Sequence, residues 1–292
     1  MSGVAIVTDS TAALPKELAL AHGVHVVPLS ISFGQQSVRD GVDLTLSEFY
    51  RRLRAASAPP TTSQPAAGDF LDLYRRLSEK AEAIVSIHIS KELSGTLESA
   101  QTARQILKVE TPKQDAPGVP IHILDSRTVS GGLGLIVLAA ARAAMAGKSA
   151  SEVIQAAEAV IPRTNVIFTV ETLEYLRKGG RIGGAAALLG VVLDIKPILD
   201  IRDGRIEVLE KVRSKKQARA RLPEIMAERS GPDTQIHVAV LHADAPEEAN
   251  RLADDISAHF NVAEQLVIDI GAAIGTHTGP GTLGLAFYTN PE

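Results

Sequence analysis

The segment from Ala83 to Thr96 constrains the fold of this chain more than any other. Its first half, Ala-Ile-Val-Ser-Ile-His-Ile, is rich in β-branched residues and is typical of a buried strand. Its second half is a loop that ends in Ser-Gly-Thr. Apolar residues then recur at helical spacing, at Leu97, Ala100, Ala103 and Leu107. The segment therefore predicts a strand, a short loop and an amphipathic helix whose N-cap is Ser94 or a close neighbour.

The loop of this unit has the chemistry to bind a small anion. A helix N-terminus presents free backbone N–H groups and the positive end of the helix dipole. Ser94 and Thr96 add neutral hydroxyl donors, although such residues before a helix are most often only caps. Two more polar segments, Pro60–Pro65 and Ile274–Gly281, are bounded by proline or glycine. Three loops of this kind favour one convergent site for a carboxylate or a phosphate.

Composition narrows the class of protein. The chain has 292 residues, a formal net charge of −4 and no cysteine. The weak negative charge gives no long-range attraction to nucleic acid or anionic lipid, and the absence of cysteine excludes disulfides and thiolate chemistry. The first residues lack the features of a signal peptide, and the longest apolar run, Gly131 to Met145, is short for a membrane span and carries Arg142. A soluble, cytoplasmic protein is expected.

Strand and helix signals alternate through the first half of the chain. Strands are expected at 4–8, 24–30, 83–89 and 121–125, with helices between them. This alternation predicts an α/β domain with a largely parallel sheet. The segment from Gly131 to Met145 follows as a helix that is apolar on nearly all faces, which predicts complete burial. It serves either as a central core helix or as one wall of an apolar cavity.

The second half differs in kind. Pro162-Arg163 is typical of a boundary, and two strands at 195–201 and 205–212 follow, joined by Arg202-Asp203-Gly204. An Asp-Gly turn between apolar strands predicts a β-hairpin. Further strands and helices mark this half as α+β. We therefore expect two domains, residues 1–162 and residues 163–292.

Motifs of common enzymes are incomplete or missing. Gly147-Lys148-Ser149 resembles the end of a P-loop, but Arg142 stands where its first glycine is needed. Glu92 and Thr96 occupy the glycine positions of a nucleophile elbow around Ser94. No His/Asp/Glu spacing for a metal and no complete dinucleotide fingerprint occurs. We expect neither a catalytic residue nor a metal or cofactor.

Six short motifs nevertheless occur in order along almost the whole chain. They are Val-Thr-Asp-Ser-Thr-Ala at 7–12, Thr-Ser-Gln-Pro at 62–65, Ile-Ser-Lys-Glu-Leu-Ser-Gly-Thr at 89–96, Asp-Ser-Arg-Thr-Val-Ser-Gly-Gly at 125–132, Leu-Glu-Tyr-Leu-Arg-Lys-Gly-Gly-Arg-Ile at 173–182 and Gly-Thr-His-Thr-Gly-Pro-Gly at 275–281. Together they resemble the DegV family, bacterial fatty-acid-binding proteins that include the FakB subunits of fatty acid kinase.

The resemblance implies that one long-chain fatty acid is buried between the two domains. Its carboxylate would be bound by residues of the polar segments, which are Thr62, Ser63, Ser94, Gly95, Thr96, His277 and Thr278. Arg181 and Arg213 match basic positions near the head group or at a docking surface for the kinase. The resemblance also implies a carrier subunit without catalysis of its own, which presents the carboxylate to an ATP-using partner for acyl-phosphate formation in phospholipid synthesis.

Two other functions remain open at this point. Ser94 as nucleophile and His277 as base would make an acyl hydrolase, although no third member of a triad is assigned. The same polar loops would also suit a sensor module for a small anionic metabolite.

Overall fold

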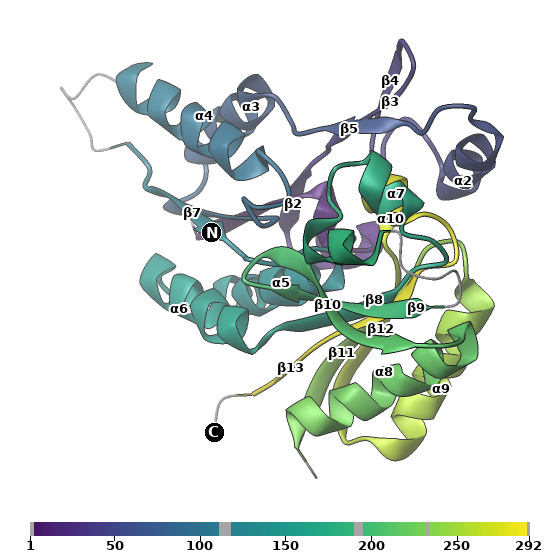
Figure 1. Cartoon of the computed structure of the whole chain (residues 1–292). Coiled ribbons are helices and arrows are strands. Elements are labelled where there is room, and N and C mark those ends of the chain that lie inside the picture. Colours follow the sequence, from purple (N-terminus) through teal and green to yellow (C-terminus); the bar gives the residue numbers. More distant parts are fainter. Residues whose placement is uncertain (1–2, 111–117, 190–194, 232–233, 291–292) are drawn as a thin grey trace.

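Two β-sheets with one helix between them form the body of the molecule (Figure 1). The structure is a computed structural model, and it describes residues 3–110, 118–189, 195–231 and 234–290. Residues 1–2 and 291–292, at the outer ends of the two expected domains, therefore lie outside the described residues. The predicted α/β fold, with a parallel N-terminal sheet and a mixed C-terminal sheet, is confirmed. The domain boundary at residue 163 stays a prediction.

The N-terminal sheet is parallel throughout and has the order β2-β1-β6-β7. Its strands are β1 Val4–Asp9, β2 Val24–Val27, β6 Ala83–His88 and β7 Ile121–Asp125. All six residues of β6 are buried, as expected for a strand inside a parallel sheet covered on both faces. One face packs against α3 Ala67–Ser78 and α4 Thr96–Glu110, and the other against α5 Gly131–Met145 and α6 Ala150–Val160. Helix α1 Lys16–Ala21 connects β1 to β2.

The C-terminal sheet has six strands in the order β10-β9-β8-β13-β11-β12. These are β8 Asn165–Thr169, β9 Lys196–Arg202, β10 Arg205–Val212, β11 Ile236–His242, β12 Val262–Asp269 and β13 Leu283–Thr289. Only β11 and β12 pair in parallel. The predicted hairpin is confirmed, because β9 and β10 are joined by Asp203 and Gly204, both with positive φ, as a type I′ turn requires. Helices α8 Lys215–Ser230 and α9 Pro246–His259 cover one face.

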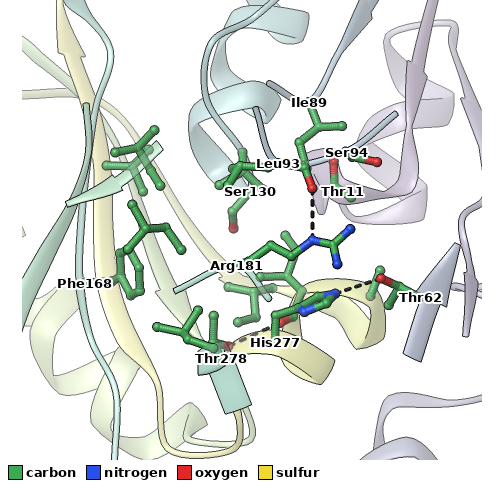
Figure 2. Close-up of a pocket in the computed structure, with 18 of the residues that line it drawn as sticks. Thr11, Thr62, Ile89, Leu93, Ser94, Ser130, Phe168, Arg181, His277 and Thr278 are labelled. Carbon is green, nitrogen blue, oxygen red and sulfur yellow. Dashed lines mark hydrogen bonds between the residues drawn. The ribbon is translucent and has the colours of Figure 1, made fainter. Parts of the chain in front are cut away.

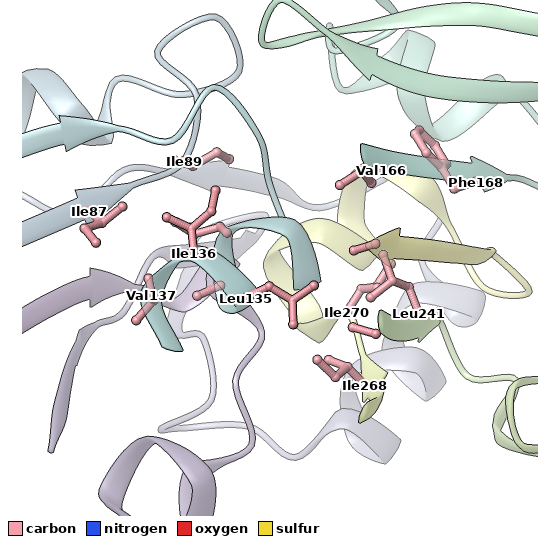
Figure 3. Packing of buried hydrophobic residues seen from close by; sticks show 14 of the residues in the cluster. Ile87, Ile89, Leu135, Ile136, Val137, Val166, Phe168, Leu241, Ile268 and Ile270 are labelled. Carbon is pink, nitrogen blue, oxygen red and sulfur yellow. The ribbon is translucent and has the colours of Figure 1, made fainter. Parts of the chain in front are cut away.

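Helix α5 packs between the two sheets and joins their cores. Figure 3 shows Ile136 and Val137 of this helix, with Ile87 of the N-terminal sheet on one side and Leu241 of the C-terminal sheet on the other. Its first residues are glycines because the helix approaches β8 and β11 closely. A Cβ at Gly131 would lie 2.6 Å from a Leu241 methyl carbon. The core-helix alternative for this segment is thus confirmed.

A third, small sheet was not predicted. It has the order β4-β3-β5, with β3 Ser30–Phe33, β4 Gln36–Arg39 and β5 Thr61–Ser63, and α2 Leu46–Ala55 lies in the connection from β4 to β5. The expected single strand at 24–30 is wrong, because Pro28 has no N–H for a ladder and β2 ends at Val27. The segment Pro60–Pro65 was expected to be a loop. This is wrong in its centre, because Thr62 belongs to strand β5 and pairs with Ile31 of β3.

The segment Ile274–Gly281 is also not a loop. Most of it forms the end of α10 Gly271–Thr278, and Gly279, with φ +77°, ends the helix. Burial of Ala272, Ala273 and Thr276 holds this helix although glycine and threonine are poor helix formers. The other short elements are α7 Glu174–Lys178 and the 3₁₀ turns Ser10–Ala12, Ile161–Arg163 and Gly183–Leu188. Among the described helices, none combines the length and the apolar character needed to cross a membrane.

Candidate functional site

A cavity lies where the three sheets meet, and most of its wall is aliphatic (Figure 2). The N-terminal half contributes Leu29, Ile89, Leu93 and Val129. The C-terminal sheet and its connections contribute Val166, Phe168, Leu176, Ile201, Ile206 and Leu241, and the region of α10 adds Ile270, Ala273 and Ile274. The polar residues on the wall are Thr11, Thr62, Gln64, Ser94, Ser130, Arg181, His277, Thr278 and Thr282. An apolar cavity with a few convergent polar groups is the usual form of a small-molecule site.

One hydrogen bond joins two predicted residues across the cavity. Thr62 Oγ1 lies 2.7 Å from His277 Nε2, so β5 and the last turn of α10 meet although 215 positions separate them in sequence. Nδ1 of His277 is buried and has no hydrogen-bond partner among the described residues. Burial, and then the nearby charge of Arg181, lower the pKa of His277 to about 4. At neutral pH the imidazole is therefore uncharged, and its Nδ1 lies against Gly179.

Arg181 is the only charged residue among the described residues of the wall. Its Nε donates to the carbonyl of Leu93 (3.2 Å) and its Nη1 to the carbonyl of Gly179 (2.8 Å). These bonds hold the guanidinium beside His277, between Leu93 and the Thr62–His277 pair (Figure 2). No ion pair connects it to a carboxylate of the described part of the chain. A cation without a counter-ion beside an apolar cavity favours a bound anion.

Ser94 lies in the loop before α4, as predicted, and lines the cavity. Its hydroxyl pairs with that of Thr96 at 2.9 Å. Thr96 itself is buried and is not part of the wall. A Cβ at Gly95 would lie 2.7 Å from the Gln64 side-chain amide. The glycine thus lets the loop of β6 and the segment after β5 come together.

Of the remaining predicted residues, one lines the cavity and two do not. Thr278 lines the cavity and donates to the carbonyl of Ile274 (3.4 Å). Ser63 and Arg213 are exposed and are not part of the wall. The structure therefore gathers Thr62, Ser94, His277, Thr278 and Arg181 in one site. The ligand contacts assigned to all of these residues stay predictions.

Sequence reasoning missed a buried carboxylate that organises the wall. Asp9 Oδ1 accepts the N–H of Thr11 (3.0 Å), and its Oδ2 accepts the N–H of Ile89 (3.1 Å) and lies 3.0 Å from His88 Nδ1. Thr11 and Ile89 both line the cavity, so one side chain fixes the loops after β1 and β6. The position of Asp9 at the carboxyl end of β1 was a usable signal, since sites gather there in α/β sheets. Gln64 was inside a quoted motif and was also missed.

The geometry offers no preformed pair for nucleophilic catalysis. The Ser94 hydroxyl pairs with Thr96, and His277 Nε2 pairs with Thr62. No hydrogen bond between Ser94 and His277 occurs among those of the described residues. A nucleophile and its base ordinarily lie within hydrogen-bond reach. In the same described residues, no group of three or more His, Asp or Glu side chains could hold a metal ion.

Comparison with known proteins gives one family. The model of the DegV family, described as an uncharacterised protein family, matches residues 3–290. A DegV domain-containing protein of Streptomyces coelicolor is 43% identical over 284 residues, which cover 97% of this chain and 97% of that protein.

Solved structures agree over the full length. A DegV family protein from Thermus thermophilus, described for its fatty acid binding, has a TM-score of 0.90 and 35% identity and covers 98% of this chain and 99% of its own. DegV of Bacillus subtilis, described as a fatty acid binding protein, has a TM-score of 0.89 and 32% identity and covers 99% of this chain and 100% of its own.

Proposed function

The chain belongs to the DegV family, and from that premise we propose that it binds one long-chain fatty acid in the cavity. The acyl chain lies along the aliphatic wall, and the carboxylate lies at the end formed by Thr62, Ser94, His277 and Arg181. The fatty acids of the two structurally similar proteins support this ligand class. The aliphatic wall with a single unpaired cation at one end is the observation that carries the proposal.

Two different sources of free energy act on such a ligand. Each methylene moved from water into an apolar cavity contributes about 0.8 kcal/mol, so the tail supplies most of the affinity. A buried carboxylate without partners would be very costly. Thr62, Ser94 and the neutral His277 offer hydrogen bonds, and Arg181 offers a charge that no carboxylate of the described residues neutralises. The head group is thus satisfied rather than tightly clamped.

Such moderate binding of the carboxylate suits a carrier protein that presents its fatty acid to another protein. We propose that an ATP-using kinase of the same cell docks at the head-group end and phosphorylates the carboxylate. Uncharged donors leave carboxylate oxygens with more electron density than a bidentate arginine pair would, so one oxygen stays able to attack the γ-phosphate. Arg181 lies at this end of the cavity, and the exposed Arg213 suits a docking surface. The same proposal places the protein in the cytoplasm, where the acyl phosphate formed by the kinase would enter phospholipid synthesis.

Native mass spectrometry of the purified protein tests the ligand class. A long-chain fatty acid should co-purify, whereas a small polar metabolite in its place would favour the sensor alternative. The double variant Thr62→Val plus Ser94→Ala should lose most of the bound lipid and most of its phosphorylation by the kinase. Thr61→Val is a matched control, because its exposed side chain belongs to the same strand but not to the cavity wall. Full lipid content in the double variant would contradict the head-group assignment.

A serine-reactive phosphonate tests the hydrolase alternative. Because the Ser94 hydroxyl pairs with Thr96 rather than with His277, we expect no covalent labelling. Labelling of Ser94 would overturn the carrier proposal.

A further inference from the structure

Ser130 places a free hydroxyl inside the apolar part of the cavity. The residue is 2% exposed and lines the wall. Its Oγ has no hydrogen-bond partner among the described residues. Figure 2 shows this hydroxyl pointing toward the space between Phe168 and Arg181, with Thr62 on the far side of Arg181. A buried polar group without a partner costs about 1–3 kcal/mol, so its presence in an aliphatic wall calls for an explanation.

The backbone of Ser130 accounts for the free hydroxyl. Ser130 stands at the N-cap position of α5, where a serine usually accepts a hydrogen bond from the first turn of its helix. Here φ is +59° and ψ is −142°, and the side chain makes no capping bond. The bond from Ser130 N–H to the Thr11 carbonyl (2.9 Å) and the bond from Gly134 N–H to the Ser130 carbonyl (2.9 Å) hold this conformation. A non-glycine residue in this region is strained, and such strain gathers at ligand sites.

The end of helix α5 adds to the polarity of this spot. Without a side-chain cap, the N–H groups of its first turn lack their usual acceptor, and the positive end of the helix dipole lies beside Ser130. Gly131 and Gly132 are buried and do not line the cavity, so the helix end acts on this spot through its dipole. The hydroxyl and the helix end together favour an oxygen acceptor on a ligand.

We propose that Ser130, at the N-terminus of α5, forms a second, inner polar subsite, which binds an oxygen carried along the acyl chain. The preferred ligands are then long-chain acids with a hydroxyl or keto group within the chain, in addition to plain fatty acids. Ser130 Oγ donates to this oxygen. The inference rests on the proposed function, because it assumes that the carboxylate lies at Thr62 and His277.

Binding of stearic acid and of a positional series of monohydroxystearic acids tests the subsite. Delipidated protein is titrated with each acid, and the ratio of its affinity to that of stearic acid is compared along the series. We expect one hydroxyl position to give a maximum in this ratio. Ser130→Gly should lower the maximum about tenfold, which corresponds to about 1.4 kcal/mol. Glycine removes the hydroxyl and suits the positive φ, so the backbone is retained.

Thr128→Val is the matched control. Thr128 also carries a buried hydroxyl without a partner among the described residues, but it is not part of the wall, so the maximum should persist. A flat ratio in the wild type, or an equal maximum in Ser130→Gly, would overturn the subsite while stearic acid still binds. If neither stearic acid nor any hydroxystearic acid binds, the proposed function falls and the subsite falls with it.

Discussion

His277 is the residue at which burial, charge and ligand chemistry meet. Its ring lies against Gly179, where a methyl group would overlap Nδ1, and its other nitrogen bonds to Thr62. The low pKa follows from this position, because burial and Arg181 both disfavour the imidazolium. A neutral imidazole leaves Arg181 as the only cation of the described wall.

The low pKa of His277 predicts a loss of stability in acid. The unfolded chain binds a proton near the ordinary pKa of 6.5, whereas the folded protein does so only near 4. The contribution of the neutral residue is therefore complete above about pH 6.5 and is lost as the pH falls to about 4, by at most about 3 kcal/mol. Urea denaturation at about pH 7 and about pH 5 should show a smaller fall for His277→Gln than for the wild type.

The wild type must be compared with His277→Gln because a second buried group, Asp40, changes the stability in the opposite direction as the pH falls. Burial raises the pKa of Asp40 to about 6, so its contribution grows as the pH falls through that value. Asp40 is unchanged in His277→Gln, and its effect cancels in the difference. Equal losses in both proteins would show that His277 does not titrate between these limits.

Gly179 should be required for fatty acid binding for steric reasons alone. Its φ of −76° suits any residue, so the main effect of Gly179→Ala is the overlap with His277, beside a closer approach to the Tyr175 carbonyl. We expect the affinity for stearic acid to fall about tenfold or more, as the Thr62–His277 bond is displaced. In Gly180→Ala the methyl group meets open space at φ +69°, which costs about 1 kcal/mol of stability but leaves the affinity unchanged. Equal affinity losses would point to loop rigidity instead of the His277 contact.

At the scale of elements, the β9–β10 hairpin covers the cavity and rests on the loop before α4. Ile201 and Ile206 of the hairpin line the wall. Its turn touches the opposite half of the molecule, because a methyl group at Gly204 would overlap the Ser90 hydroxyl. The salt bridge from Arg127 to Asp203 (2.6 Å) lies at the same contact.

Gly204→Ala should therefore lower the free energy of unfolding by more than the backbone strain at this position alone would. The wild-type φ is +81°, and the methyl group would also push on Ser90. Gly34→Ala provides the matched control, since Gly34 has φ +62° in the two-residue turn between β3 and β4 and faces open space. We expect about 1 kcal/mol for Gly34→Ala and about 2 kcal/mol or more for Gly204→Ala in chemical denaturation. If Gly204→Ala and Gly34→Ala lost the same stability, the contact with Ser90 would not contribute.

The sequence predicted those elements whose signals are local, and it missed those that depend on contacts between distant parts of the chain. The β9–β10 hairpin and the unit of β6, loop and α4 were predicted because their signals are local: an Asp-Gly turn and helical spacing after Ser94. The pairing of β3 with β5 was missed because it joins Ile31 to Thr62, and short strands carry too little pattern to specify a distant partner. His277 was expected in a loop because tertiary burial, rather than helix propensity, stabilises α10.

The site shows the same division. Polar motifs indicated Thr62, Ser94 and His277, and the structure brings these residues to one cavity. Asp9 was not predicted, because a carboxylate at the end of a strand is as often a turn residue as an organiser of neighbouring loops. Ser130 could not be recognised, since a serine before Gly-Gly is typical of a cap and its positive φ depends on the bond to Thr11.

At the scale of the whole molecule, the cavity is enclosed by parts of all three sheets. Its wall includes Ile89 after the N-terminal sheet, Thr62 of the small sheet and Phe168 of the C-terminal sheet. One apolar cluster continues from the N-terminal sheet through α5 to strands β8 and β11. A ligand in this cavity would contact each part, and its binding energy would oppose their separation.

Fatty acid should consequently stabilise the molecule as one unit. At a hundredfold excess over Kd, a ligand that binds only the folded state contributes about 2.7 kcal/mol, which raises Tm by roughly 5–10 °C for a chain of this size. Delipidated protein with and without stearic acid is compared by calorimetry and by hydrogen exchange. Protection should increase in β5, in β8 and in α10 together, since each borders the cavity. In Thr62→Val plus Ser94→Ala both effects should shrink, because the head group loses its partners. Protection confined to one sheet would mean that the acid binds to that part alone, and the cavity between the sheets would not be its site.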